Sequence, residues 1–288
     1  MRFGTRVCIG LVGMVLVGAA CGGDEPESPV FKELAPGGGQ LELGHVHGLG
    51  LNPADGLLYV ATHSGLYRLK DGVAEPVGER RWDVMGFTVR GPDDFIGGGH
   101  PSPNEIRDGE YPPLLGFIQS RDAAQSWEIL AMRGETDLHA LAVGDGIIYA
   151  ADATSGRFLA SADGQSWEAR SQLVAWSITV EEDGGLLATT PEGPQSSGDQ
   201  GRTWTPLAGA PALVLVAAQP GNGAWGTDEN GLVYKRGPGD RWDNVGSVAG
   251  RPEALIATES RLFAATDAGI FESADGRLWT PLYSAPGG

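Results

Sequence analysis

The sequence predicts an all-β fold and, within that class, a six-bladed β-propeller. Five tryptophans recur at separations of 40, 37, 38 and 37 residues, namely Trp127, Trp167, Trp204, Trp242 and Trp279. Upstream of each lie two short segments that alternate apolar and polar residues, as half-buried strands do. The 46 glycines and 19 prolines are spread along the chain and indicate frequent turns. A repeat of roughly 40 residues with short strands is typical of propeller blades.

Six repeat units can be counted along the chain. They begin near His45, Asp83, Asp137, Val174, Leu213 and Arg251. Each unit shows two clear strands, as in HGLGLN followed by LLYVATHSG, and has room for two more. Four-stranded units that stack in a ring leave no open edges. We therefore favour a propeller over a solenoid or a split into two domains.

Four of the recurring tryptophans end a turn of similar composition. The best-formed turn is SGDQGRTW (Ser197 to Trp204), and incomplete forms are SRDAAQSW, SADGQSW and SADGRLW. In such a turn aspartate accepts backbone N–H bonds, glycine takes a positive φ and tryptophan packs between sheets. The segment GPGDRW keeps little beyond Asp240 and Trp242. We interpret the turn aspartates as structural rather than catalytic; they are Asp122, Asp163, Asp199 and Asp275.

The N-terminus has the pattern of a lipoprotein export signal. Arg2 and Arg6 precede an apolar run, and VGAAC ends that run with small residues and Cys21. The run is shorter than the roughly 20 apolar residues that span a bilayer. We therefore predict a signal peptide over 1–20, a lipid on Cys21, a flexible tether over 21–43 and a propeller over 44–288. The expected location is the surface or outer leaflet of a bacterial cell, with the membrane as a partner.

Charge and cysteine content exclude several functions. The formal net charge is −17, and loss of the two signal arginines makes it −19 in the mature chain. Binding to nucleic acid is not expected, because it requires neutralisation of phosphates. Both cysteines lie at or before position 21, which excludes disulfides and thiolate metal sites from the folded part. We expect a monomer.

All five histidines map to one face of the predicted propeller. The start of a first strand and the end of a second strand share that face, because adjacent strands run in opposite directions. His45, His47 and His139 lie at first-strand starts. His63 and His100 lie at second-strand ends. They come from three consecutive units, so we expect them to meet at the mouth of the central channel.

Alignment of the unit starts adds further candidates for this mouth. HVHGL, DVMGF and DLHAL match, which makes His47, Met85 and His139 equivalent. Trp176 and Glu253 take that position in units four and six, and unit five offers no polar residue there. Imidazole, thioether and carboxylate groups suit a soft or borderline transition metal, copper above others, with zinc as the alternative. The predicted metal ligands are His45, His47, His63, Met85, His100 and His139, and the predicted ligand-binding residues are Asp83, Asp137, Asp152, Trp176 and Glu253.

The second unit contains an insertion directly after His100. It is PSPNEIRDGEYPPLL (Pro101 to Leu115), and its candidate chemical groups are Glu105, Glu110 and Tyr111. Connections longer than usual are often lids or binding elements. A plain surface excursion is the equal alternative.

Most of the mature chain resembles a group of exported bacterial propellers with BNR (Asp-box) repeats, described as glycosyl-hydrolase-like or sortilin-like. The resemblance rests on HVHGLGLNPADGLLYVATHSGLYRL, WDVMGFTV, GGGHP, PPLLGFIQS, DLHAL and DATSGR. It implies the propeller fold and carries a glycosyl hydrolase name. The F/Y-R-I-P segment of sialidases is absent, and nothing marks Arg68, Arg157 and Arg261 as an arginine triad. The resemblance therefore leaves the activity open.

Three functions are consistent with these observations. The first is a surface-anchored binding propeller whose channel mouth holds a ligand or a metal ion. The second is a glycoside hydrolase acting on extracellular glycans. It needs two carboxyl groups ~5 Å apart for retention or ~6.5–9.5 Å apart for inversion, and Asp83, Asp137 and Asp152 are the candidates. The third is a protein-interaction or assembly-factor scaffold, with an envelope protein as a possible partner, which requires a broad apolar patch. A model of the fold that brings the histidines together would favour the first.

Overall fold

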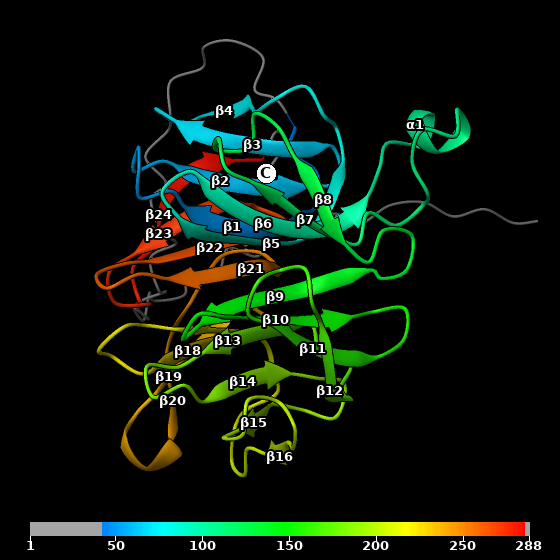
Figure 1. Ribbon diagram of the computed structural model, residues 1–288. Helices are drawn as coiled ribbons and strands as arrows, with labels where there is room; N and C mark the ends of the chain where they lie inside the picture. The colour runs from blue at the N-terminus through cyan, green and yellow to red at the C-terminus, as the bar shows by residue number, and fades with distance from the viewer. Residues whose placement is uncertain (1–41, 286–288) are drawn as a thin grey trace, which may run out of the picture. The chain divides into compact units, whose positions relative to one another are not determined.

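The computed structural model describes residues 42–285, which form six four-stranded antiparallel sheets. The predicted signal peptide, Cys21 and the predicted tether up to residue 41 lie outside the described residues. Within every sheet the strands follow one another in chain order (Figure 1). The six sheets are the blades of a β-propeller, which confirms the predicted fold. Their first strands begin within three residues of the predicted unit starts.

The first three blades carry the histidines. Blade 1 contains β1 (Val46–Leu51), β2 (Leu58–Thr62), β3 (Gly65–Lys70) and β4 (Val73–Pro76). Blade 2 contains β5 (Asp83–Gly91), β6 (Asp94–His100), β7 (Phe117–Ser120) and β8 (Glu128–Ala131). Blade 3 contains β9 (Leu138–Gly144), β10 (Ile147–Asp152), β11 (Arg157–Ser161) and β12 (Glu168–Gln172).

The last three blades complete the ring. Blade 4 contains β13 (Ser177–Val180), β14 (Leu186–Thr189), β15 (Gln195–Ser197) and β16 (Thr205–Pro206). Blade 5 contains β17 (Leu213–Ala218), β18 (Ala224–Asp228), β19 (Leu232–Arg236) and β20 (Trp242–Ser247). Blade 6 contains β21 (Pro252–Ala257), β22 (Leu262–Thr266), β23 (Gly269–Ser273) and β24 (Thr280–Ser284).

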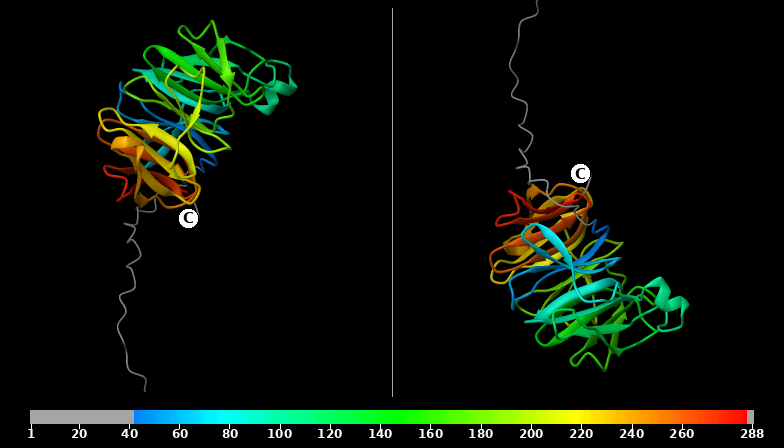
Figure 2. Two further views of the ribbon diagram at one scale, coloured as in Figure 1. Left: turned by 90° about the horizontal axis from the view of Figure 1, so that it is seen from below. Right: turned by 90° about the horizontal axis from the view of Figure 1, so that it is seen from above.

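In the part of the chain that the structure describes, helical structure is confined to two short elements. The helix α1 (Pro103–Arg107) lies in the insertion after β6, and the 3₁₀ turn η1 (Pro238–Asp240) joins β19 to β20. Figure 2 shows α1 projecting beyond the strands in both views. Across residues 42–285, neither helix has the length and apolar character needed to cross a membrane.

The hydrophobic core is divided into six clusters, one between each pair of adjacent blades. Alternating strand residues point to the two faces of each sheet, so every blade packs against both neighbours. Tyr59 of blade 1 and Phe95 of blade 2 meet edge to face with their ring centroids 4.8 Å apart. Leu49 of blade 1 and Phe263 of blade 6 belong to the cluster that closes the ring. Figure 2 accordingly shows the blue first blade beside the red last blade.

The turns between third and fourth strands lie on the face opposite the histidines. In the turn after β15, Asp199 Oδ1 accepts the backbone N–H groups of Arg202 at 3.0 Å and Thr203 at 2.9 Å. The hydroxyl of Ser197 accepts the N–H of Gly201 at 2.9 Å. These bonds hold the turn closed. Blade 5 departs from this pattern, because η1 replaces the turn and the buried Trp242 already belongs to β20.

Candidate metal centre at the channel mouth

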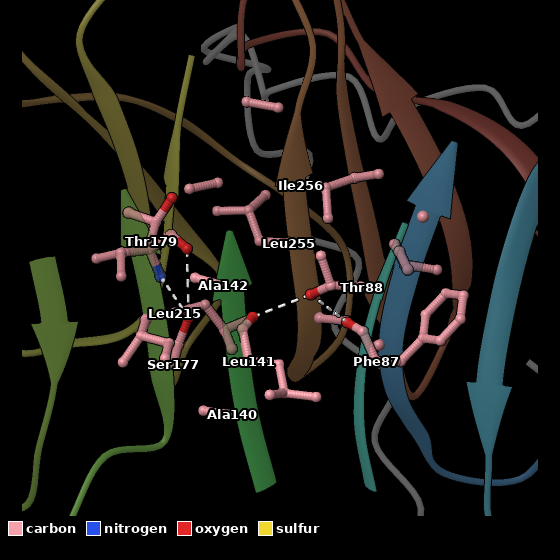
Figure 3. A pocket seen from close by; sticks show the side chains of 18 of the residues that line it. Phe87, Thr88, Ala140, Leu141, Ala142, Ser177, Thr179, Leu215, Leu255 and Ile256 are labelled. Carbon is pink, nitrogen blue, oxygen red and sulfur yellow. Dashed lines mark hydrogen bonds between the residues drawn. The ribbon is translucent and has the colours of Figure 1, made fainter. Parts of the chain in front are cut away.

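The first strands of all six blades surround a central cavity of about 380 Å³. Most of the side chains that line it are apolar, as Leu141 and Leu215 illustrate in Figure 3. The hydroxyl groups on the wall already have partners. Thr88 Oγ1 donates to the carbonyl of Leu141 at 3.0 Å, and Ser177 Oγ donates to that of Val216 at 3.2 Å. These bonds tie neighbouring first strands together. The titratable residues of the lining are His47, His139 and Glu253, and they lie at the starts of first strands and therefore at the mouth.

A β-bulge near the start of the first strand recurs in five of the six blades. The bulged residues are His47, Met85, His139, Val214 and Glu253. A bulge inserts an extra residue and re-aims its side chain. The ladder of β13 is regular, with Trp176 just before it. The bulges therefore explain why the aligned residues share one position, and they identify Val214 as the residue of blade 5.

The first histidine cluster consists of His47, His63 and Asp83, between blades 1 and 2. His47 Nε2 lies 3.0 Å from His63 Nδ1 and 3.2 Å from Asp83 Oδ1. His63 Nδ1 lies 2.9 Å from Asp83 Oδ2. The His47 side chain is only 6% exposed, whereas that of His63 is 55% exposed. One side of this cluster is therefore buried and the other faces solvent.

The second histidine cluster consists of His100, Asp137 and His139, between blades 2 and 3. His139 Nε2 lies 2.8 Å from Asp137 Oδ2, and His100 Nε2 lies 3.4 Å from Asp137 Oδ1. The carbonyl oxygen of Pro113 lies 3.0 Å from His100 Nδ1. A carbonyl only accepts hydrogen bonds, so Nδ1 carries the hydrogen. A neutral His100 then presents the lone pair of Nε2 to the Asp137 carboxylate.

Each cluster leaves one buried carboxylate oxygen without a hydrogen bond. These atoms are Asp83 Oδ1 and Asp137 Oδ1. Buried polar atoms are normally paired, because leaving one unpaired costs free energy. His63 Nδ1 adds to the mismatch, since its single hydrogen or lone pair faces both His47 and Asp83. A cation placed among the three side chains would satisfy these atoms.

The spacing of the donor atoms fits a small transition-metal ion. In each cluster one ligand atom from each of the three residues lies within 4.8 Å of the others. The contacts of 2.9–3.2 Å in the first cluster, and those of 2.8 and 3.4 Å to the two oxygens of Asp137 in the second, are close to the roughly 3.3 Å between ligand atoms in a tetrahedral site with metal–ligand bonds of ~2.0–2.1 Å. Three protein ligands also leave a coordination position open.

The electrostatics of the clusters differ from residue to residue. Burial lowers the pKa of His47 below its usual value, against the effect of Asp83. Burial acts to raise the pKa of Asp83, but contacts with His47 and His63 overcome it and hold that pKa low. The bond to Asp137 raises the pKa of His139, and the charge of Asp83 adds to this effect. Asp83 is therefore a carboxylate at neutral pH, as a metal ligand must be.

Glycines ahead of His100 allow blades 2 and 3 to approach. A Cβ atom on Gly98 would lie 2.7 Å from the Cβ of Leu138, at the start of β9. Gly99 has a φ of 138°, and a Cβ there would lie 2.0 Å from the carbonyl oxygen of Asp83. Only glycine is compatible with that position. The sequence GGGH therefore brings the end of β6 against β9, which places His100 beside Asp137.

His45 lies next to the first cluster but pairs with blade 6. Its Nδ1 is 2.7 Å from Glu253 Oε1, and the other oxygen of Glu253 accepts the N–H of Val46 at 2.9 Å. The His45 ring lies 4.8 Å from that of His47 and 5.6 Å from that of His63, centroid to centroid. Glu253 thus fixes the His45 ring at the edge of the cluster and links the first and last blades.

The remaining predicted site residues occupy separate places. Asp152 is 1% exposed and accepts the backbone N–H groups of Asp137 and Thr154, both at 3.1 Å. It therefore supports the second cluster from behind. Trp176 is 52% exposed on the other side of the mouth. Met85 occupies the bulge of blade 2, the blade shared by both clusters. Four of the predicted ligands thus form two groups rather than one, His47 with His63 and His100 with His139, and His45 lies beside the first group.

The insertion after His100 is anchored to the body of the propeller. Ser102 and Glu105 form a capping box at the start of α1. Glu105 accepts the indole N–H of Trp82 at 2.9 Å and pairs with Arg80, whose guanidinium also contacts Tyr111 OH at 3.2 Å. The polar groups of the insertion therefore hold it in place. Its effect on the site comes through Pro113, a contact that the sequence analysis missed because backbone carbonyls carry no residue-specific signal.

Comparisons with known proteins identify the fold and no family. No protein-family model matches the chain, and no curated protein matches it. Among solved structures, the extracellular domain of a hybrid two-component system protein from B. thetaiotaomicron aligns with a TM-score of 0.56 at 13% identity, covering 84% of this chain and 34% of that one. The structure described as YCF48 bound to D1 peptide aligns with a TM-score of 0.55 at 15% identity, covering 84% of this chain and 83% of that one.

A GH74 xyloglucanase from Xanthomonas campestris aligns with a TM-score of 0.54 at 18% identity, covering 83% of this chain and 45% of the enzyme. The chain thus spans about a third of the two-component system domain and less than half of the xyloglucanase. At these identities the likeness shows a shared propeller fold alone. Function has to be argued from the site.

Proposed function

We propose that this chain is an exported, lipid-anchored propeller of the BNR (Asp-box) group whose channel mouth binds a transition-metal ion, with copper or zinc as the best-suited metals. The export signal and Cys21 support the anchoring. Solved neighbours described as extracellular or surface proteins have the same fold, which is consistent with export. The metal is supported by the chemistry of the two histidine clusters.

The observation that carries the proposal is the pair of unsatisfied carboxylate oxygens. If the histidines only bridged loops in a wet channel, each buried oxygen would be expected to have a hydrogen-bond donor. The groups nearest to these oxygens are His47 Nε2, 3.2 Å from Asp83 Oδ1, and His100 Nε2, 3.4 Å from Asp137 Oδ1, and neither contact has the geometry of a hydrogen bond. Nitrogen and oxygen donors in this mixture suit zinc and copper(II).

The test is a titration of metal-free mature protein with Zn(II), Cu(II) and Cu(I). We expect stoichiometric binding by the parent and loss of it in the variant His47→Ala, Met85→Ala, His139→Ala. Glu229→Gln is the control, because it removes an exposed carboxylate from the β18–β19 turn, on the same face but outside the clusters. Binding weaker than millimolar by the parent, or equal binding by the triple variant, would refute the proposal.

The glycoside hydrolase hypothesis receives less support from the site. Asp83 and Asp137 are each engaged by imidazoles, and Asp152 is buried at the end of β10. A glycosidase requires one carboxyl group to act as an acid and another to face the sugar. The xyloglucanase neighbour shares the fold, which does not transfer its substrate to this chain.

The scaffold hypothesis lacks the apolar patch that it requires. Over residues 42–285 the exposed large hydrophobic side chains are Val73, Val174, Trp176, Leu232 and Leu278. Val174 and Trp176 lie together just before β13, and the other three belong to other blades. This surface is small compared with a protein interface. Metal binding is therefore the function that the described residues support best.

A further inference from the structure

The two histidine clusters repeat each other one blade apart. Both use a residue at the end of a second strand and the residue that starts the next blade. Each is completed by a bulged histidine, from the preceding blade in the first cluster and from the following blade in the second. In that order the residues are His63, Asp83 and His47, and His100, Asp137 and His139.

Each cluster is complete without the other. They share no side chain, and each has its own unsatisfied carboxylate oxygen. The contacts inside one cluster therefore do not satisfy the other. One ion in either cluster would leave the unpaired carboxylate oxygen of the other cluster in place, whereas one cation in each cluster would satisfy both oxygens.

Blade 2 brings the two clusters close together. Asp83 and His100 are directly paired across β5 and β6, and residues so paired have Cα atoms about 4.5–5.5 Å apart. One belongs to the first cluster and the other to the second. A charge placed in one cluster therefore interacts electrostatically with the side chains of the other.

We propose that the channel mouth binds two metal ions, one in each histidine cluster, and that each ion weakens the binding of the other. This inference rests on the proposed metal-binding function and adds its stoichiometry and coupling. Each cluster has one carboxylate, so a divalent ion leaves it with a net positive charge. Couplings between sites commonly change affinity 5- to 150-fold, and we expect about tenfold here.

The experiment measures Zn(II) and Cu(II) binding to metal-free mature protein by calorimetry, with native mass spectrometry to count the ions. The variants are His63→Gln for the first cluster and His139→Gln for the second. Both histidines are partly exposed, so the fold should tolerate the changes. Glu229→Gln serves as the control. A second readout is the dipolar broadening of the Cu(II) electron paramagnetic resonance spectrum, which requires two nearby ions.

The parent should bind two ions, the second about tenfold more weakly than the first. Each variant should bind one ion, and the site retained should lack the tenfold penalty and the dipolar broadening. One ion in the parent that either variant abolishes would overturn the inference and keep the proposed function. Two ions with equal, independent affinities would overturn the coupling. Absence of binding in the parent would overturn both proposals.

Discussion

Replacement of Trp204 by alanine tests whether the turns between third and fourth strands hold the blades together. The indole packs edge-on against Phe158 of blade 3, with the ring centroids 5.1 Å apart, and its Nε1–H donates to Ser171 Oγ at 3.1 Å. Deletion of a fully buried large aromatic costs ~3–5 kcal/mol. Trp204 is partly exposed, which reduces that cost, and the lost hydrogen bond adds ~1 kcal/mol. We expect a loss of about 2–4 kcal/mol.

The assay is urea denaturation of the mature chain, which reports the unfolding free energy through its midpoint and slope. Trp204→Phe is the matched control. It keeps an aromatic edge near Phe158 and removes the bond to Ser171, so it should cost only ~1 kcal/mol. A midpoint equal to that of the parent in Trp204→Ala would refute the assignment. Equal costs for alanine and phenylalanine would show that packing between blades 3 and 4 contributes nothing.

Three further predictions address the site, the turns and the anchor. Gly98→Ala should push β9 away through Leu138 and weaken metal binding in the second cluster by about tenfold or more, with the first cluster unaffected in the same titration. Backbone bonds from Ser166 and Gln165 lower the pKa of Asp163 to about 2, so its contribution to stability should be complete above about pH 4 and lost as the pH falls towards 2. The urea midpoint of Asp163→Asn should change less with pH over that range than the midpoint of the parent does. An equal pH dependence in the two proteins would contradict this prediction. Cys21→Ser should abolish acylation, measured by fatty-acid labelling in a bacterial host, and a labelled variant would disprove the signal.

The fold could be predicted because each repeat unit has a recognisable pattern of residue types. Tryptophan spacing, alternating strands and turn residues follow directly from burial and backbone conformation. The departures occur where local chemistry changes. In blade 4 the first strand begins at Ser177, three residues after the predicted start at Val174. In blade 5 the η1 turn takes the place of a serine–aspartate turn, as the poor match of GPGDRW to the pattern indicates.

The site could be predicted only as a set of residues on one face. Strand direction fixes the face, and the aligned unit starts contain the bulge position, although only the register shows that it is a bulge. The grouping depends on features without a residue-specific signal. These are the carbonyl of Pro113 that orients His100 and the close approach that Gly98 permits. The neighbour of a side chain across a blade interface is a tertiary property.

The division into two clusters nevertheless follows from the ring itself. In a propeller each blade contacts only its two neighbours, so side chains from three consecutive blades meet pairwise at two interfaces. The end of a second strand faces the start of the next blade, which pairs His63 with Asp83 and His100 with Asp137. A bulged histidine completes each cluster. His47 of blade 1 completes the first, and His139 of blade 3 completes the second. Met85 takes the bulge between them, so blade 2 contributes a ligand to each cluster through Asp83 and His100 while its own bulge carries no imidazole. A charge bound at one interface must therefore act on the other through blade 2.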